Sequence, residues 1–341
     1  MADDEQEDAT QNIRVAVRCR PLSKKELGNN EESIFSMDSG NVCLKGPEGQ
    51  VQKFNFDGIF PPGCAQTEIW DWLGQPLLDK CIEGFNGTVS ASRPLITIAV
   101  VILCCLCKSL AKWASQTVLA KLLAQAVSFQ RDKPFSHRLT SSRLAFHFKV
   151  FAYGQTGSGK TWSMQGVPGD DELRGLIPRF TIKLFERIQE EKAKDENKLF
   201  LITCSYFEIY NEVISDLLDP STKKKSSGLD VKEHPVLGVY VKGLQEIVTE
   251  EHKKMQKLID QGMSNRHVAA TKMNAESSRS HSVFTIKIHQ KDKTDDSKST
   301  FAKVNLVDLA GSERCDAGHA SASFLRLPSD EPALMPQFYS I

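Results

Sequence analysis

The chain has 341 residues, of which 40% are hydrophobic and 25% charged, enough apolar material for one large folded core. Its 43 Lys and Arg residues balance 43 Asp and Glu residues, and this zero net charge disfavours a strongly basic nucleic-acid binder. The 9 cysteines show neither paired CxxC units nor matching histidines, which disfavours a zinc site and a disulfide framework and indicates reduced thiols in the cytoplasm.

The beginning of the chain predicts an acidic tail, then a strand and a helix. Residues 1–11 are polar and acidic, unlike a signal peptide, and we expect them to be disordered. Ile13 to Arg18 alternates between apolar and polar residues as a strand does, and Thr67 to Cys81 has the periodicity of a helix. The apolar residues on one side of this helix are Ile69, Trp70, Leu73, Leu77 and Leu78.

Residues 95–107 form an apolar run in which Thr97 is the only polar residue. The run is shorter than the ~20 residues that a membrane-spanning helix needs. We therefore interpret it as an apolar stretch, with a membrane anchor as the alternative. Its three cysteines have no other metal ligands beside them, and residues 109–127 look like an amphipathic helix.

The most informative segment runs from Phe151 to Trp162 and contains the phosphate-loop pattern G-x-x-x-x-G-K-[ST]. Its glycines let several backbone N–H groups point at one anion, Lys160 supplies a cation for the terminal phosphates, and Thr161 offers a hydroxyl to Mg²⁺. A strand-like segment precedes the loop and a short helical stretch follows it, which disfavours a chance glycine-rich turn. The loop residues assigned to the nucleotide are Gly154, Gln155, Thr156, Gly157, Ser158, Gly159, Lys160 and Thr161.

The rest of the chain alternates between helix and strand patterns. Pro178 can open a helix, and residues 250–262 read as another. Residues 199–210 read as a strand, and residues 282–288 with 301–309 as a hairpin. We predict an α/β sandwich of the phosphate-loop class, with ligands at the carboxyl ends of the sheet strands. The apolar side of the helix at Pro178 consists of Ile177, Phe180, Leu184, Phe185 and Ile188.

Two polar segments add to the phosphate loop. Asn274 to His281 carries three serine hydroxyls and a guanidinium, groups suited to sensing a γ-phosphate and its metal. Val304 to Asp308 reads as a buried strand that ends in an acid suited to a Mg²⁺ shell, and Gly311 can bring its N–H to a phosphate. Taken singly, a serine cluster is often a solvated loop and a strand-end Asp a cap. Together, and in this order, they indicate a nucleotide sensor.

The segments GQTGSGKT, NAESSRSH and VDLAGSE resemble the nucleotide loop, switch I and switch II of the kinesin motor domain, in the family's order. Arg18-Cys-Arg20-Pro21 is similar to the family's R-x-R-P strand on the adenine side, and residues 229–241 and 267–274 look most like the kinesin-3 branch. The resemblance implies a three-layer α/β sandwich around a mixed central β-sheet, incomplete at the C-terminus.

The resemblance also implies ATP and Mg²⁺ as cofactors. Lys160 would neutralise the β- and γ-phosphates. Thr161 and Ser278 would ligate Mg²⁺, with Asp308 in its outer shell. The residues implied on the adenine side are Arg18, Arg20, Pro21 and Trp162.

The switch residues receive catalytic roles from the same resemblance. Ser277 and the N–H of Gly311 would sense the γ-phosphate. Arg279 and Glu313 would form an ion pair that closes the two switches and helps to position the attacking water.

The resemblance covers residues 12–89 and 151–314. The expected domain of residues 12–314 is thus a partial motor domain, interrupted by a foreign insert at 90–150 and followed by a tail at 315–341 that we expect to be disordered. Both foreign stretches suggest translated intron sequence or a mispredicted gene model. An insertion inside a buried strand would leave backbone groups without partners. We therefore predict that Phe146 to Val150 replaces Asn86 to Val89 in the strand that enters the loop, with the insert extruded to the surface.

These features predict an ATPase that acts as a microtubule motor in the cytoplasm, on the cytoskeleton, with its activity impaired by the insert and the truncation. Microtubules are the implied partner and nucleic acid is not, and no oligomeric state is predicted. The alternative is a truncated nucleotide-binding product without motor activity, associated with a membrane through residues 95–107.

Overall fold

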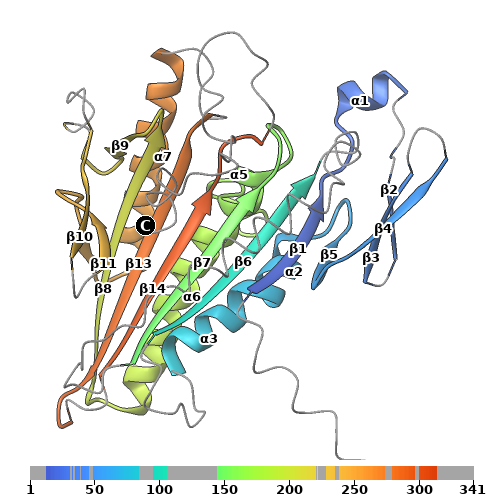
Figure 1. Cartoon of the computed structure of the whole chain (residues 1–341). Helices are drawn as coiled ribbons and strands as arrows, with labels where there is room; N and C mark the ends of the chain where they lie inside the picture. Colours follow the sequence, from blue (N-terminus) through green and yellow to red (C-terminus); the bar gives the residue numbers. More distant parts are fainter. Residues whose placement is uncertain are drawn as a thin grey trace, which may run out of the picture.

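The computed structural model describes residues 13–30, 33, 35–38, 40–45, 49–83, 95–105, 144–219, 221, 228–234, 238–272, 279–295 and 299–312. The described chain combines strands and helices, and several strands follow one another directly in two parts of it (Figure 1). The elements before the phosphate loop are β1 (Ile13–Cys19), α1 (Lys24–Gly28), β2 (Phe35–Asp38), β3 (Asn41–Lys45), β4 (Val51–Asn55), β5 (Gly58–Phe60), α2 (Gln66–Ile69), η1 (Trp70–Gly74), α3 (Gln75–Glu83), β6 (Leu95–Cys105) and β7 (Leu144–Tyr153). The elements after it are α5 (Lys160–Met164), α6 (Leu176–Lys194), β8 (Lys198–Tyr210), β9 (Val213–Asp216), β10 (Val231–His234), β11 (Gly238–Val241), β12 (Ile247–Thr249), α7 (His252–Lys272), β13 (His281–Asp292) and β14 (Thr300–Asp308).

Among the described residues a mixed, 9-stranded sheet forms the centre, in the order β12-β8-β13-β14-β7-β6-β1-β5, with β9 paired to β8. The strands from β5 to β14 in this order run parallel, whereas β13, β8 and β12 each pair antiparallel with their neighbours. Because β7 and β14 are adjacent and parallel, their carboxyl ends meet at one edge of the sheet. That edge is where the predicted ligand site should lie.

The helices α2, α3, α5, α6 and α7 contribute to a single core against one face of this sheet (Figure 1). Alternate residues of β14, such as Val304 and Leu306, are buried in that core. On the opposite face, Val307 packs with Phe151 and with Val241 of the β10–β11 hairpin. The predicted α/β class with a mixed central sheet is confirmed.

The helix predicted over residues 67–81 is present as α2, η1 and α3, and all five of its predicted core residues are buried. The π-helical turn η1 in its middle was not predicted. It brings the ring of Trp70 so close to Gly74 that a Cβ at residue 74 would lie 2.2 Å from the ring. Helix α6 likewise buries all five of its predicted apolar residues.

The predicted extrusion of the insert is wrong for residues 95–105, because these residues form β6 inside the central sheet. Val101 of β6 pairs with Val15 of β1 and with Phe151 of β7. A continuous apolar run is typical of a parallel strand with both faces covered, and ladders on both sides satisfy its backbone groups. None of the described helices has the length and apolar character needed to cross a bilayer.

The strand that enters the phosphate loop is β7, which is continuous from Leu144 to Tyr153. As predicted, residues 146–150 therefore occupy the strand before the loop, and Phe148 and Val150 are buried in the core. Their alternation places them on the helix-covered face. Residues 86–89, which were expected to be displaced, lie outside the described part of the chain, as do residues 1–11, 109–127 and 315–341.

Strand β13 and strand β14 form the predicted antiparallel hairpin, with Ser282 paired to Asp308. The helix predicted over residues 250–262 is α7, which begins at His252 and continues ten residues further, to Lys272. This extension has consequences for the site, because it carries Arg266.

Gly262→Ala should destabilise the fold by about 1–3 kcal/mol through overpacking. A Cβ at residue 262 would lie 2.2 Å from Cδ1 of Tyr206, whose side chain is 1% exposed. Gly28→Ala is the matched control, since nothing lies within 4 Å of a Cβ there and Gly28 is also helical. Urea unfolding should show a lower free energy of unfolding for Gly262→Ala and not for Gly28→Ala. Equal stabilities of the two variants would contradict the close packing of α7 on β8.

Candidate functional site

The predicted phosphate loop lies between the end of β7 and the start of α5, as its sequence requires. Gly157 and Gly159 have φ angles of 77° and 99°, a region that glycine enters at no steric cost. The N–H of Ser158 donates to the carbonyl oxygen of Gln155 at 3.1 Å and closes a turn within the loop. The strand, loop and helix context of the motif is therefore confirmed.

Lys160 is 7% exposed and folds back across the loop. Its Nζ donates to the carbonyl oxygens of Gly154 at 3.0 Å and Gln155 at 2.8 Å. The ammonium group is thus held at the loop itself, where it can meet the charge of a bound phosphate.

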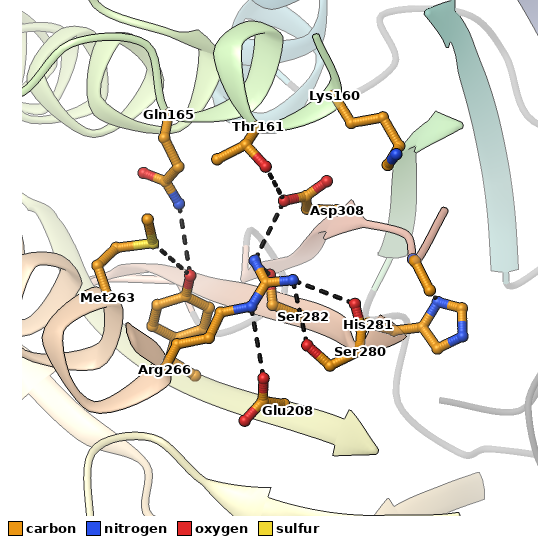
Figure 2. Close-up of polar contacts among 12 residues, drawn as sticks. Lys160, Thr161, Gln165, Glu208, Met263, Arg266, Ser280, His281, Ser282 and Asp308 are labelled. Atoms are coloured by element: carbon orange, nitrogen blue, oxygen red, sulfur yellow. Dashed lines mark hydrogen bonds and ion pairs between the residues drawn. The ribbon is translucent and has the colours of Figure 1, made fainter. Parts of the chain in front are cut away.

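Thr161 and Asp308 meet at the shared edge of β7 and β14 (Figure 2). Oγ1 of Thr161 donates to Oδ2 of Asp308 at 2.7 Å. Oδ1 of Asp308 is buried and makes no hydrogen bond within the described part of the chain, so an oxygen suited to Mg²⁺ or its water shell is available. No group of three or more His, Cys, Asp or Glu side chains gathers among the described residues. The residues fit a Mg²⁺ that takes most of its ligands from phosphate and water.

Arg266 of α7 is a site residue that the sequence analysis missed. Its side chain is 4% exposed, and Nη1 donates to Oδ2 of Asp308 at 3.1 Å and to Oγ of Ser282 at 3.1 Å. Nη2 donates to the carbonyl oxygen of Ser280 at 3.1 Å, and Nε lies 3.5 Å from Oε1 of Glu208 (Figure 2). One guanidinium therefore joins α7, β8, β13 and β14 beside the loop.

A signal for Arg266 was present in the sequence. Met255, Ile259 and Gly262 form the core-facing stripe of α7, and Arg266 comes four residues after Gly262 on the same side. The prediction ended the helix at Gly262, so the stripe was not extended. A charged residue that continues a core stripe indicates a buried partner.

The segment after β14 is tied to the phosphate-loop strand. The N–H of Leu309 donates to the carbonyl oxygen of Ala152 at 3.1 Å, and the N–H of Ser312 donates to that of Gly154 at 3.0 Å. Gly311 therefore lies between two residues that are hydrogen-bonded to β7 and to the first residue of the phosphate loop. The predicted contact between the N–H of Gly311 and a γ-phosphate stays a prediction.

His281 should make the fold less stable in mild acid. Its Nδ1 accepts a hydrogen bond from the N–H of Ala310 at 3.1 Å, which requires this nitrogen to be unprotonated. Burial, together with the nearby charge of Arg266, lowers the pKa of His281 to about 4. Because the pKa in the folded state lies below the unfolded value, the stabilisation is complete above about pH 6.5 and declines as the pH falls toward 4.

Between about pH 7 and pH 5 we expect this histidine to cost the fold about 2 kcal/mol. His147, whose pKa burial also lowers to about 4, should add a change of the same sign. Urea unfolding at the two pH values measures the sum. His281→Asn should show a smaller pH dependence than the parent chain, and an unchanged dependence would contradict the assignment.

Two of the residues predicted on the adenine side, Arg18 and Arg20, make different contacts. Nη1 of Arg18 donates to Oε1 of Gln66 at 2.8 Å and to Oγ of Ser163 at 3.1 Å, so this guanidinium is used inside the protein. Nε of Arg20 donates to the carbonyl oxygen of Gly157 at 2.8 Å, which brings Arg20 to the phosphate loop. Nη1 of Arg20 also donates to the carbonyl oxygen of the adjacent Pro21, at 2.7 Å. Trp162 is 41% exposed on α5.

The switch residues are only partly within the described chain. Ser277, Ser278 and Glu313 lie outside it, so neither the predicted metal contact of Ser278 nor the Arg279–Glu313 ion pair is tested. Arg279 is described and exposed.

A glycine-rich loop between a sheet strand and a helix, with a Thr–Asp pair beside it, defines a nucleotide-binding protein of the phosphate-loop class. A family model described as the kinesin motor domain matches residues 129–326, more than half of the chain. The chain therefore belongs to the kinesin motor-domain family.

Similar proteins include kinesin-like protein KIF3C of Pongo abelii, 34% identical over 330 residues that cover 94% of this chain and 33% of that protein. KIF3C of Mus musculus is 34% identical over 314 residues, covering 90% of this chain and 31% of that protein. The chain thus spans about a third of the length of these relatives. A solved structure described as a fast kinesin superposes with a TM-score of 0.66 at 31% identity, covering 91% of this chain and 68% of that one.

Proposed function

We propose that this chain binds and hydrolyses ATP as the motor domain of a microtubule-based motor that works on the cytoskeleton in the cytoplasm. The observation that carries the proposal is the hydrogen bond of 2.7 Å between Thr161 of the phosphate loop and Asp308 at the end of β14. This bond places the phosphate loop in direct contact with the end of β14. Motors of this class need both segments beside one nucleotide. The similar proteins support the same function, because they are a kinesin-like protein and a fast kinesin whose structure bears on ATPase mechanism and on interactions with microtubules.

Within this proposal the phosphate loop holds the triphosphate and Lys160 neutralises its β- and γ-phosphates. Thr161 and Ser278 would hold Mg²⁺, with Asp308 in its outer shell, and the ion would supply positive charge that offsets the charge of the phosphates. The buried Oδ1 of Asp308 supports this assignment.

The remaining predicted residues act on the γ-phosphate and the base. Ser277 and the N–H of Gly311 would sense the γ-phosphate, and Arg279 with Glu313 would position the attacking water. The contact between Ser312 and Gly154 supports this role, since it couples the segment after β14 to the loop. The residues proposed on the adenine side remain Arg18, Arg20, Pro21 and Trp162.

We also propose membership of the kinesin-3 branch. The proposal rests on residues 229–241 and 267–274, whose sequences look most like that branch.

Microtubule-stimulated ATP turnover by the purified chain tests the proposed function. We expect a phosphate release rate that rises with microtubule concentration and is lost in Lys160→Ala. A motor function would be contradicted if the chain did not turn over ATP, or if microtubules did not change its turnover rate. A chain that bound ATP without such stimulation would be a nucleotide-binding protein and not a motor.

A further inference from the structure

A buried hydrogen-bonded chain links strand β1 to the helix of the phosphate loop through one glutamine side chain. Gln66, the first residue of α2, is 4% exposed. Its Nε2 donates to the carbonyl oxygen of Trp162 at 2.8 Å, and its Oε1 accepts from Nη1 of Arg18 at 2.8 Å. The same guanidinium nitrogen of Arg18 reaches Oγ of Ser163 at 3.1 Å. Two neighbouring residues of α5 are therefore held from one side.

The amide is well matched to this place because it offers a donor and an acceptor at once. The cationic Arg18 requires an oxygen, and the carbonyl group of Trp162 requires an N–H. Helix α5 has five residues, and the last carbonyl groups of a helix have no partner within it. Gln66 supplies that partner for Trp162, which fixes the backbone from which the exposed indole projects.

We propose that Gln66 is a positioning residue that sets the place of Trp162 on the base side of the nucleotide site, separately from the phosphate-binding loop. The inference rests on the proposed function, in which Lys160 and the loop hold the phosphates. Loss of the Gln66–Trp162 hydrogen bond should then lower the affinity for a ligand that carries a base. It should leave the affinity for a ligand made of phosphate alone unchanged.

Gln66→Glu separates the two bonds of this side chain. The carboxylate keeps an oxygen for Arg18 but has no N–H for the carbonyl group of Trp162. Gln66→Met has a similar length and removes both bonds. Gln256→Met is the matched control, because Gln256 is a partly exposed residue of α7 whose Nε2 donates to Oδ1 of Asp260, one helical turn away, at 2.9 Å.

The experiment compares the binding of ATP and of inorganic triphosphate by calorimetry, both with Mg²⁺, alongside the melting temperature of each variant. Gln66→Glu should bind ATP about tenfold more weakly than the parent chain and triphosphate equally well. Gln256→Met should bind both as the parent chain does. Parent-like ATP binding by Gln66→Glu overturns the proposal, and so does an equal loss for both ligands. If Gln66→Glu does not fold, Gln66→Met is judged by the same comparison.

Lys160→Ala separates this inference from the proposed function. If the loop holds the phosphates, Lys160→Ala should weaken ATP and triphosphate alike. Parent-like binding of both ligands by that variant would reject the phosphate site itself, whatever Gln66 does.

Discussion

Lys160→Ala should lower the affinity of the chain for ATP with Mg²⁺ by about 30-fold or more. The Nζ of Lys160 is held beside the loop by the carbonyl oxygens of Gly154 and Gln155, at 3.0 and 2.8 Å. A bound triphosphate would therefore meet a cation that is already in place and largely shielded from water, where charge–charge attraction is strong. Truncation removes this cation and leaves the phosphate charge to the backbone N–H groups of the loop and to Mg²⁺.

Calorimetric titration measures this affinity, and thermal unfolding shows whether the variant is folded. Lys183→Ala is the matched control, since Lys183 is an exposed lysine of α6 whose ion pair with Glu186 contributes little. We expect parent-like ATP affinity for the control. The same result for Lys160→Ala would mean that the loop is not the triphosphate site.

The sequence predicted those helices whose apolar residues repeat along one side. All the predicted apolar residues of the helix at residues 67–81 and of α6 are buried, because the apolar side of a surface helix packs against a core. The π-helical turn η1 was not predictable in this way. Within it the ring of Trp70 lies close against Gly74, and periodicity carries no information on such a contact.

Strand β6 shows a limit of comparison with a family pattern. The apolar run at residues 95–105 was judged foreign and assigned to the surface, although a continuous run of β-branched and aliphatic residues is typical of a buried parallel strand. The length of the run disfavoured a spanning helix but did not separate an apolar surface stretch from a buried strand. Pairing with β1 and β7, which decides the outcome, joins residues far apart in the chain.

Some residues of the site could also be predicted from the sequence and others could not. The phosphate loop was predictable because one local pattern specifies its glycines, its lysine and its threonine. The burial of Arg266 could be inferred from the stripe of α7, but the partners of Arg266 and Gln66 could not, since they come from other elements: Asp308 and Ser282 for Arg266, and Arg18 and Trp162 for Gln66. A single amide side chain is most often exposed, so sequence alone favours the wrong environment for Gln66.

Arg266→Met should destabilise the fold by about 3–5 kcal/mol, the range found when one partner of a buried ion pair is removed. The side chains of Asp308 and Glu208 are 3% and 10% exposed, and both lie against this guanidinium. Without it, the two carboxylates lose the opposite charge that offsets the cost of their burial. Arg266→Lys should fall between the parent chain and Arg266→Met, because an ammonium group restores charge but not the planar fork of donors.

Urea unfolding of three further variants tests whether charge is the cause. Arg174→Met should change stability by less than about 1 kcal/mol, since its partner Asp171 is exposed to solvent. Adding Glu208→Gln to Arg266→Met should recover part of the loss, because one of the two buried charges is then removed, whereas Glu208→Gln alone should be destabilising. If Arg266→Met unfolded like the Arg174 control, Arg266 would not hold α7, β8, β13 and β14 together. If the double variant were less stable than Arg266→Met, the loss would come from packing of the arginine side chain and not from the carboxylates that it neutralises.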